Sequence, residues 1–506
     1  MTRCSNWLLL LGILGFTSGL LGQGTASEKF FTAKDQGEFK AAVAAAVEGD
    51  TIIVAFDADG MDIRGKSGAP GKFIRIMADR QLGRTTKTIT IKDCQHVAVE
   101  GFKIAGFAGN AVKIVASKHL ILTHNLFDFT GIGAANGIYT SGGSIHDIEI
   151  GFNEFNHHVA AGKWAGSYIK TWFDGTDVAK RLWIHDNCFA NVAPQLDEKR
   201  GRPGNPFSGD SDREAIIFGE GASQNIETHH LIEDNVFEDC DGEDEIVSFK
   251  TSKNTFSRNI VRNCMGSVHI RFGHGSEVNG NVFTGDVVTD FSDAAYVAHA
   301  NYESSGVVVY GTDHKIYNNH FENLTGGRTS KHRLPIVLDS GDTDETTGNN
   351  HQRPRGVLIA HNTIVNCEYG IGVGLNYSLP PQNCVIANNL LVGKAHVLFR
   401  MSADSESDTT CTYAGNIAWA TAPGSYGTEK PLTKKDPLLV TASLNGWTLS
   451  VLTAGSPAIN ASIASEVKED VFSGLRQDRP DVGAQEFGIT MSWPPRQRWQ
   501  VGPNAD

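Results

Sequence analysis

Four side chains that could carry out acid–base chemistry lie close together in the sequence. Glu243 and Glu245 are two residues apart, so on a β-strand both carboxylates would project from the same face. Lys250 follows Glu245 after four intervening residues, and Arg271 lies 21 residues beyond Lys250. If that interval is one coil of a repeating fold, Lys250 and Arg271 stand side by side. Two acids, a lysine and an arginine on one face would suit an anionic sugar, because lysine can act as a base and arginine pairs with oxyanions.

The glutamates also indicate a metal. Glu243 and Glu245 offer hard oxygen ligands, and a cation between them would explain why two carboxylates converge. Oxygen ligands of this kind suit Ca²⁺. We therefore expect a Ca²⁺ site next to the lysine and arginine.

An asparagine-centred pattern recurs along the chain and predicts how these side chains are positioned. Apolar and polar residues precede each Asn, and an apolar residue follows two positions later. The copies are centred on Asn125, Asn153, Asn187, Asn235, Asn259, Asn281, Asn319, Asn362 and Asn389. The closest copies are 22 and 24 residues apart, which is typical of a solenoid whose coils each contribute short strands. We expect the Asn amides to stack along the axis at a turn, since Asn tolerates left-handed backbone.

This repeat predicts an all-β fold, a right-handed parallel β-helix of roughly a dozen coils with inserts forming a groove on one face. Helical periodicity is confined to Gln36–Asp50, which we expect to cap the N-terminal end as a helix. The repeat fades after Asp404, so a segment from about residue 405 is expected to close the other end. A β-propeller and a pair of β-sandwiches are the alternatives. Cys240 and Cys264, one coil apart, should stack either as free thiols or as a disulfide.

The N-terminus has the pattern of an export signal. Arg3 precedes an apolar run from Trp7 to Leu21, and small residues follow. We expect residues 1–27 to be a signal peptide and residues 28–506 to form one secreted or periplasmic domain; a buried first helix is the alternative. The 57 Asp and Glu against 44 Lys and Arg argue against a nucleic-acid or anionic-membrane partner. A polyanion could still bind in a locally basic groove.

Three stretches around the four residues resemble polysaccharide lyase family 6, which comprises alginate lyases and chondroitinase B. They read EDEIVSFKTSKNT, GSVHIRFGHGSEVNGNVFTG and VVVYGTDHKIYNNHFENL, and the resemblance extends from about Ala44 to Gly488. It implies a right-handed parallel β-helix that cleaves a uronate-containing polysaccharide by β-elimination. It also implies that Lys250 is the base and that Arg271 serves as acid or stabilises the intermediate.

The resemblance further implies that Glu243 and Glu245 hold Ca²⁺, together with an Asn and a Glu from the preceding coil. Glu214 matches that Glu, but Ser211 stands at the Asn position, so Asp212 or its neighbour Asp210 is expected to replace the Asn.

A histidine normally follows the family's arginine, whereas Phe272 follows Arg271 here. We expect His269 or His274 to make the corresponding contact. Lys250 must be neutral to remove the C5 proton of a uronate, although the ordinary lysine pKa is about 10.4. Nearby Ca²⁺ and Arg271 are expected to lower the pKa of Lys250, because like charges disfavour the ammonium form.

Two basic inserts, GGRTSKHR and HQRPR, are expected to hold the carboxylates of the sugar, and Tyr310 to stack on a sugar ring. The candidates in the inserts are Arg328, Lys331, Arg333, Arg353 and Arg355. The function expected is a secreted lyase acting on an anionic polysaccharide, with alginate preferred and dermatan sulfate or chondroitin as the alternative. A β-helical hydrolase or epimerase and a non-catalytic carbohydrate-binding solenoid are further alternatives, although hydrolysis requires converging acids without a Lys–Arg pair.

Overall fold

The computed structural model describes residues 28–158, 166–193, 213–286, 303–327, 330–345, 350–393 and 396–505. The expected signal peptide at 1–27 and the candidate residues Asp212 and Arg328 lie outside these ranges. Within them, no helix has both the length and the apolar character needed to cross a bilayer.

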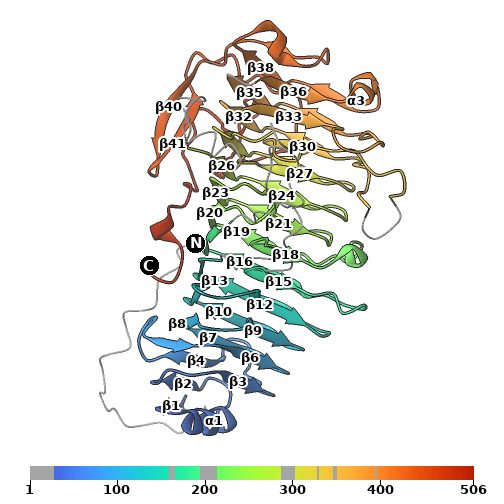
Figure 1. The fold of residues 1–506 in the computed structure, drawn as a ribbon. Coiled ribbons are helices and arrows are strands. Elements are labelled where there is room, and N and C mark those ends of the chain that lie inside the picture. The colour runs from blue at the N-terminus through green and yellow to red at the C-terminus, as the bar shows by residue number, and fades with distance from the viewer. Residues whose placement is uncertain are drawn as a thin grey trace.

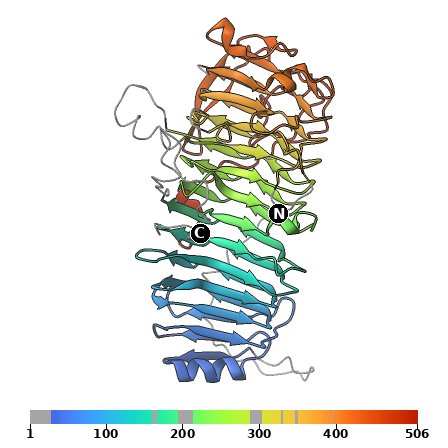
Figure 2. The same ribbon diagram turned by 45° about the vertical axis from the view of Figure 1, so that its right-hand side comes forward.

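Three long parallel sheets build the fold, and a complete coil contributes one strand to each sheet (Figures 1 and 2). Sheet A contains β1 (Phe30–Ala33), β2 (Thr51–Val54), β4 (Ile74–Ala78), β7 (Gln95–Glu100), β10 (Lys118–Thr123), β13 (His146–Gly151), β16 (Lys180–His185), β19 (Leu231–Glu233), β22 (Thr255–Ser257), β25 (Glu277–Asn279), β28 (Lys315–Tyr317), β31 (Leu358–Ala360), β34 (Val385–Ala387) and β37 (Thr412–Ala414). Sheet B contains β5 (Arg84–Thr86), β8 (Phe102–Ala105), β11 (Leu126–Asp128), β14 (Glu154–Asn156), β17 (Cys188–Val192), β20 (Val236–Cys240), β23 (Ile260–Arg262), β26 (Val282–Thr284), β29 (His320–Glu322), β32 (Thr363–Val365), β35 (Leu390–Gly393), β38 (Ile417–Ala420) and β39 (Thr433–Lys434). Sheet C contains β3 (Met61–Arg64), β6 (Ile89–Lys92), β9 (Gly109–Val115), β12 (Ala135–Ser141), β15 (Ile169–Thr171), β18 (Ile216–Phe218), β21 (Glu245–Phe249), β24 (Ser267–Ile270), β27 (Val307–Val309), β30 (Ile336–Leu338), β33 (Tyr369–Val373) and β36 (Val397–Met401).

This arrangement confirms the predicted parallel β-helix. Its interior is one continuous apolar core, because inward-facing residues of successive coils stack on one another. Phe127, Phe155, Phe189 and Phe237 form such a column, with ring centroids 4.3, 5.0 and 4.7 Å apart. Parallel rings in register favour the same spacing that the backbone hydrogen bonds require, so core packing and strand register support each other.

The repeated asparagines form the predicted ladder, which is fully buried at the turn between sheets A and B. Asn235 Nδ2 donates to Asn259 Oδ1 at 3.0 Å, and Asn259 Nδ2 donates to Asn281 Oδ1 at 3.2 Å. Asn416 extends the ladder by one coil beyond the copies recognised in the sequence. The expectation of left-handed backbone at the asparagines is wrong: the preceding residue takes that conformation, as at Arg258 (φ 55°). The Asn amide is thereby free to bond to both neighbouring coils.

The N-terminal end is capped by α1 (Gln36–Ala45), as expected, although the helix is shorter than the predicted Gln36–Asp50. Asp35 begins it by accepting hydrogen bonds from the amides of Gly37 and Glu38. Figure 1 shows α1 across the open end of the first coils.

The C-terminal segment differs from the expected closing piece. Coils continue after residue 405 through β37, β38 and β39, next to the short helix α3 (Ala403–Ser407). The antiparallel hairpin β40 (Leu439–Leu444) and β41 (Trp447–Leu452) and the tail then run back along the outside (Figure 1). Arg498 Nη1 donates to Glu238 Oε2 at 2.9 Å, and Gln81 Nε2 donates to the Pro503 carbonyl at 2.8 Å. The tail packs there because the outer face of sheet B carries apolar residues that need cover, including Val236 and Ile260.

The cysteines among the described residues are free thiols. Cys240 and Cys264 stack as expected, with the Cys240 amide 3.5 Å from Cys264 Sγ.

The ladder yields a stability prediction. Asn259→Ala should lower the free energy of unfolding by about 3 kcal/mol or more, because each buried polar group left without a partner costs roughly 1–3 kcal/mol. Chemical denaturation followed by circular dichroism measures the loss. Asn279→Ala, at a half-buried position on neighbouring β25, is the control and should cost less than about 1 kcal/mol. Equal losses in the two variants would contradict a specific role for the ladder.

Candidate active site

Lys250 and Arg271 stand side by side, as the sequence predicts. Lys250 directly follows β21 and Arg271 directly follows β24, and Phe249 is paired with Ile270 across the two strands. The Arg271 amide donates to the Phe249 carbonyl at 3.0 Å. The next two coils place Tyr310 and Asp339 at the equivalent strand ends. One edge of sheet C therefore presents a lysine, an arginine, a phenol and a carboxylate in consecutive coils.

A bulge in β21 brings Glu245 onto the same outward face. Glu245 pairs with Ser267, but Val247 pairs with Val268, so Ile246 is an extra residue in β21. Ile246 and Val247 both point into the core. Strict alternation would set Glu245 and Lys250, five residues apart, on opposite faces of the strand. The bulge corrects that mismatch, which is a common use of bulges next to active sites.

Glu214, Glu243 and Glu245 form a buried carboxylate cluster. One ligand atom from each lies within 4.8 Å of the other two, and each residue is at most 7% exposed. Gly266 contributes to this arrangement, since a Cβ there would lie 2.7 Å from both the Glu243 carbonyl and the Ile246 amide. The turn before β24 can thus pass directly over the bulge. Three buried carboxylates are an oxygen-only donor set that fits a hard cation such as Ca²⁺.

The cluster is electrostatically asymmetric. Burial and the neighbouring Glu214 and Glu245 raise the pKa of Glu243 well above its ordinary value. Burial also acts to raise the pKa of Glu245, but His269, Arg271 and Lys250 outweigh it and hold that pKa below its ordinary value. Arg271 Nη1 donates to Glu245 Oε1 at 3.1 Å. Glu245 is therefore the ionised member of the cluster. Glu243 is the member whose ionised form a bound cation would stabilise most.

The carboxylates also determine the charge of Lys250. Burial acts to lower the pKa of Lys250, yet Glu245, Glu214 and Glu243 raise it above its ordinary value. The sequence-based expectation of a lowered pKa rested on Ca²⁺ and Arg271 together, and the repulsion from Arg271 by itself does not outweigh the three acids. A cation bound among the acids would weaken their hold on the ammonium group. Glu245 likewise raises the pKa of Arg271 against the effect of burial, so Arg271 stays cationic.

His269 also belongs to the site. It is 1% exposed, its Nδ1 lies 3.4 Å from Glu245 Oε1, and burial lowers its pKa to about 3. Its ring stacks on Tyr310 with centroids 5.6 Å apart. His274, the alternative histidine, points elsewhere: its Nε2 lies 3.2 Å from Glu227 Oε1.

Tyr310 is a buried hydrogen-bonding residue, which differs from the expected sugar-stacking platform. Its hydroxyl donates to Asp339 Oδ2 at 2.6 Å and lies 3.1 Å from His332 Nε2. The rings of His351 and Tyr377 lie against it, with centroids 4.5 and 6.0 Å away. Because its ring is covered, Tyr310 orients its neighbours and does not offer a face to a sugar.

Two of the candidate arginines are paired with acids. Arg333 is 2% exposed and donates through Nε to Asp244 Oδ1 at 2.7 Å, so it does not line an open groove as expected. Burial of a guanidinium requires such a partner. Arg355 is 39% exposed and forms two hydrogen bonds to Glu345, at 2.5 and 3.1 Å.

Sequence reasoning missed several residues of this region. Asp244, Asp339 and His332 were not singled out, although they complete the ion pair of Arg333 and the hydrogen bonds of Tyr310. Counting coils from Lys250 would have found Asp339, because it occupies the equivalent strand end three coils later. His332 lies in an insert, and no repeat marks its position.

Comparisons with known proteins agree with this geometry. The family model for chondroitinase B matches residues 199–451, half of the 506-residue chain. A mutant of the PL6 family alginate lyase AlyGC is similar in structure at 19% identity and a TM-score of 0.66, covering 92% of this chain. This chain spans 59% of the length of that lyase. Curated proteins yield no match.

Two further solved structures share the fold. A mannuronic acid specific family 6 lyase from the human gut microbiota is 18% identical with a TM-score of 0.62, covering 78% of this chain and 87% of its own. A PL6 alginate lyase in complex with a trisaccharide is 16% identical with a TM-score of 0.62, covering 86% of this chain and 92% of its own. At these identities the structural likeness establishes the fold.

The two arginine pairs lead to opposite stability predictions. Arg333→Ala should lower the free energy of unfolding by about 3–5 kcal/mol, because it leaves Asp244 without its buried partner. Arg355→Ala should change it by at most about 1 kcal/mol, as expected for an exposed ion pair. Denaturant titration of both variants tests the difference. A small loss in Arg333→Ala would show that Arg333 is available to substrate after all.

Proposed function

This chain belongs to polysaccharide lyase family 6, and we propose that it cleaves a uronate-containing anionic polysaccharide, preferably alginate, by β-elimination. The observation that supports this most directly is the placement of Lys250 and Arg271 on adjacent coils beside the buried carboxylate cluster. A hydrolase needs two acids flanking a glycosidic bond. Here the acids are buried together within 4.8 Å and face a lysine and an arginine, which favours elimination.

Lys250 is the proposed base. Its neutral Nζ would take the C5 proton of the uronate, and the electrons of that bond would form the C4–C5 double bond. The bond from C4 to the leaving oxygen would break, and that oxygen would take a proton from water. The C5 proton is only weakly acidic until the adjacent carboxylate charge is balanced. The site must therefore bring positive charge to the carboxylate and hold Lys250 close to C5.

Arg271 and the carboxylate cluster supply that charge balance. Arg271 can pair with the uronate carboxylate through its donor fork and remains cationic, which favours charge stabilisation over proton donation. Glu214, Glu243 and Glu245 would hold the metal ion. When bound there, Ca²⁺ would neutralise the substrate carboxylate and stabilise the enolate-like intermediate. His269 lies between Glu245 and Tyr310, with its Nδ1 3.4 Å from Glu245 Oε1, and so limits the space in which the Glu245 carboxylate can move.

Alginate is the preferred substrate because two of the similar structures are described as alginate lyases and a third as specific for mannuronic acid. Dermatan sulfate is the alternative, supported by the chondroitinase B model. We also propose that residues 1–27 direct export, since a polymeric substrate must be met outside the cell.

The central prediction concerns Lys250. Lys250→Ala should abolish the formation of unsaturated uronate from alginate, because it removes the amine that would take the C5 proton, while the circular dichroism spectrum stays unchanged. Ultraviolet absorbance of the unsaturated product measures turnover. Lys315→Ala, which removes an exposed lysine on sheet A, is the matched control and should keep full activity.

Three results would each contradict a part of this proposal. Retained activity in Lys250→Ala would remove Lys250 as the base. Absence of product from alginate, pectate and dermatan sulfate with the wild-type chain would overturn the lyase assignment itself. If unsaturated product forms from dermatan sulfate alone, dermatan sulfate would replace alginate as the proposed substrate.

Metal removal should change the pH dependence. The three acids raise the pKa of Lys250, and neutral lysine is the active form, so activity rises with pH as Lys250 loses its proton. Chelation with EDTA should lower kcat/KM at neutral pH and move the rising limb of its pH profile to higher pH, with added Ca²⁺ reversing both effects. An unchanged profile after chelation would argue against a metal at the carboxylate cluster.

A further inference from the structure

A second cluster of potential metal ligands lies on a different sheet from the active site. His119 on β10 and His146 and Asp147 on β13 each offer one ligand atom, and these atoms lie within 4.8 Å of one another. All three belong to sheet A, whereas the carboxylate cluster and Lys250 flank strands of sheet C. We propose that this cluster, the histidine cluster, binds a borderline divalent cation such as Zn²⁺.

The backbone explains how adjacent residues of β13 reach the same point. Lys118 pairs with His146 and Leu120 with Ile148, so His119 and Asp147 lie opposite one another. Both adopt left-handed backbone, with φ of 52° and 58°. In a regular strand His146 and Asp147 would point to opposite faces. The left-handed residue breaks that alternation, and His146 Nδ1 lies 2.7 Å from Asp147 Oδ2.

The donor types select the class of metal. Two imidazoles and one carboxylate suit Zn²⁺ and similar transition-metal ions better than Ca²⁺ or Mg²⁺, which prefer oxygen ligands. Asp147 Oδ2 is also 3.6 Å from His119 Nδ1, so both imidazoles converge on the same carboxylate oxygen. Three protein ligands with an accessible fourth position are typical of an open zinc site. The side chains are 23–36% exposed, so an ion can enter from solvent.

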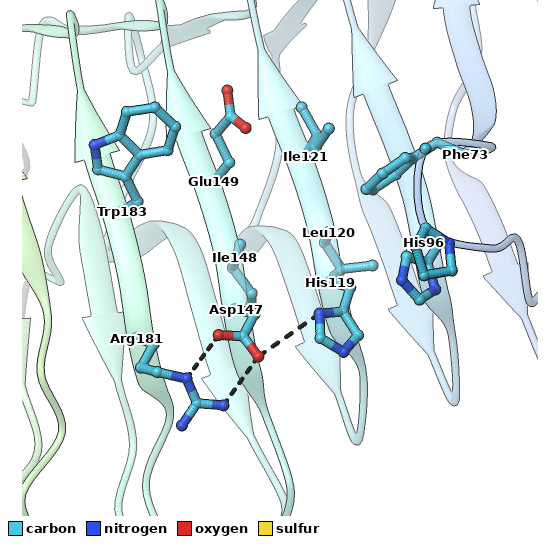
Figure 3. Close-up of a pocket in the computed structure, with 12 residues that line it drawn as sticks. Phe73, His96, His119, Leu120, Ile121, Asp147, Ile148, Glu149, Arg181 and Trp183 are labelled. Carbon is cyan, nitrogen blue, oxygen red and sulfur yellow. Dashed lines mark hydrogen bonds and ion pairs between the residues drawn. The ribbon is translucent and has the colours of Figure 1, made fainter.

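Neighbouring side chains hold the ligands in place (Figure 3). Arg181 donates through Nε to Asp147 Oδ1 at 2.6 Å and through Nη2 to Oδ2 at 2.9 Å. It lowers the pKa of Asp147 and so keeps the carboxylate ionised and oriented. His96 stacks on His119, with ring centroids 4.7 Å apart and an interplanar angle of 14°. This stacking fixes the imidazole ring of His119.

The cluster opens onto a pocket of about 510 Å³ on the outside of sheet A. Figure 3 shows two rows of side chains across the strands: Arg181, Asp147, His119 and His96 in one row, and Trp183, Glu149 and Ile121 in the other. The fourth coordination position would therefore face a space large enough for water or a small ligand. Because the ligands come from two adjacent coils, bound metal would also cross-link β10 and β13.

The test uses the full-length chain without a polyhistidine tag, dialysed against a chelator and returned to excess Ca²⁺ to occupy the oxygen-rich cluster. Titration with ZnCl₂ in a calorimeter should show one site, and Co²⁺ in place of Zn²⁺ should give visible absorption bands. His119→Ala and His146→Ala should each weaken Zn²⁺ binding by more than about 100-fold, beyond the loss expected for a group that only orients a ligand. His396→Ala, which removes an exposed histidine on another sheet, should bind as the wild type does.

Asp147→Asn keeps the shape of the third ligand and should also lose the site, which guards against misfolding of the alanine variants. Zn²⁺ should raise the Tm of the wild type and not that of the variants, because a ligand that binds only the folded state stabilises it. No Zn²⁺ binding by the wild type, or equal binding by all variants, would overturn the proposal. Lyase activity is not a readout here, so failure of this site and failure of the lyase assignment are distinguishable.

Discussion

In-register pairing of parallel strands is the constraint on which the rest of this molecule depends. Each coil must present its turn at the same height as its neighbours, and the buried asparagine ladder enforces this, since each amide bonds to the coils before and after it. The stacked phenylalanines of the core require the same spacing. Once register is fixed, any residue that follows a strand lies beside its counterpart one coil away. Lys250 and Arg271 meet for that reason, and so do His119 and Asp147.

Function is built on departures from this regularity. The bulge at Ile246 interrupts the alternation of inward- and outward-facing side chains along β21. It thereby puts Glu245 on the same face as Lys250. The left-handed residues at the start of β10 and β13 have a comparable effect on sheet A, where they bring His146 and Asp147 together. A regular β-helix alternates core and surface residues, and a local irregularity is what lets neighbouring polar side chains converge.

Electrostatics links the two halves of the active site. Buried acids cost free energy unless a cation accompanies them. Lys250 compensates part of that charge, but burial and the neighbouring Glu214 and Glu245 still raise the pKa of Glu243. The same acids stabilise Lys250 as an ammonium ion, a form that could not accept a proton in the proposed role of Lys250 as the base. A cation in the cluster would lower the pKa of Glu243 and also that of Lys250. Metal binding and the loss of the proton from Lys250 are therefore expected to be coupled.

The repeat predicted the parallel β-helix, because the Asn pattern recurs at intervals that are typical of a solenoid. It also placed Lys250 beside Arg271, since their separation matches one coil. Helical periodicity predicted the capping helix over Gln36–Asp50, and the observed helix is shorter, Gln36–Ala45. Three features could not be predicted from the repeat: the path of the C-terminal tail, the pairing of Arg333 with Asp244 and the bulge at Ile246. The path of the tail along sheet B depends on which outward residues are apolar in several coils at once.

The burial of Arg333 against Asp244 joins residues far apart in the sequence, and the bulge at Ile246 has no turn residue to mark it. Residue types and intervals thus determined which groups could meet, because strand register is a local, periodic property. Their burial, pairing and charge depended on long-range packing of inserts and tail, which only the tertiary structure decides.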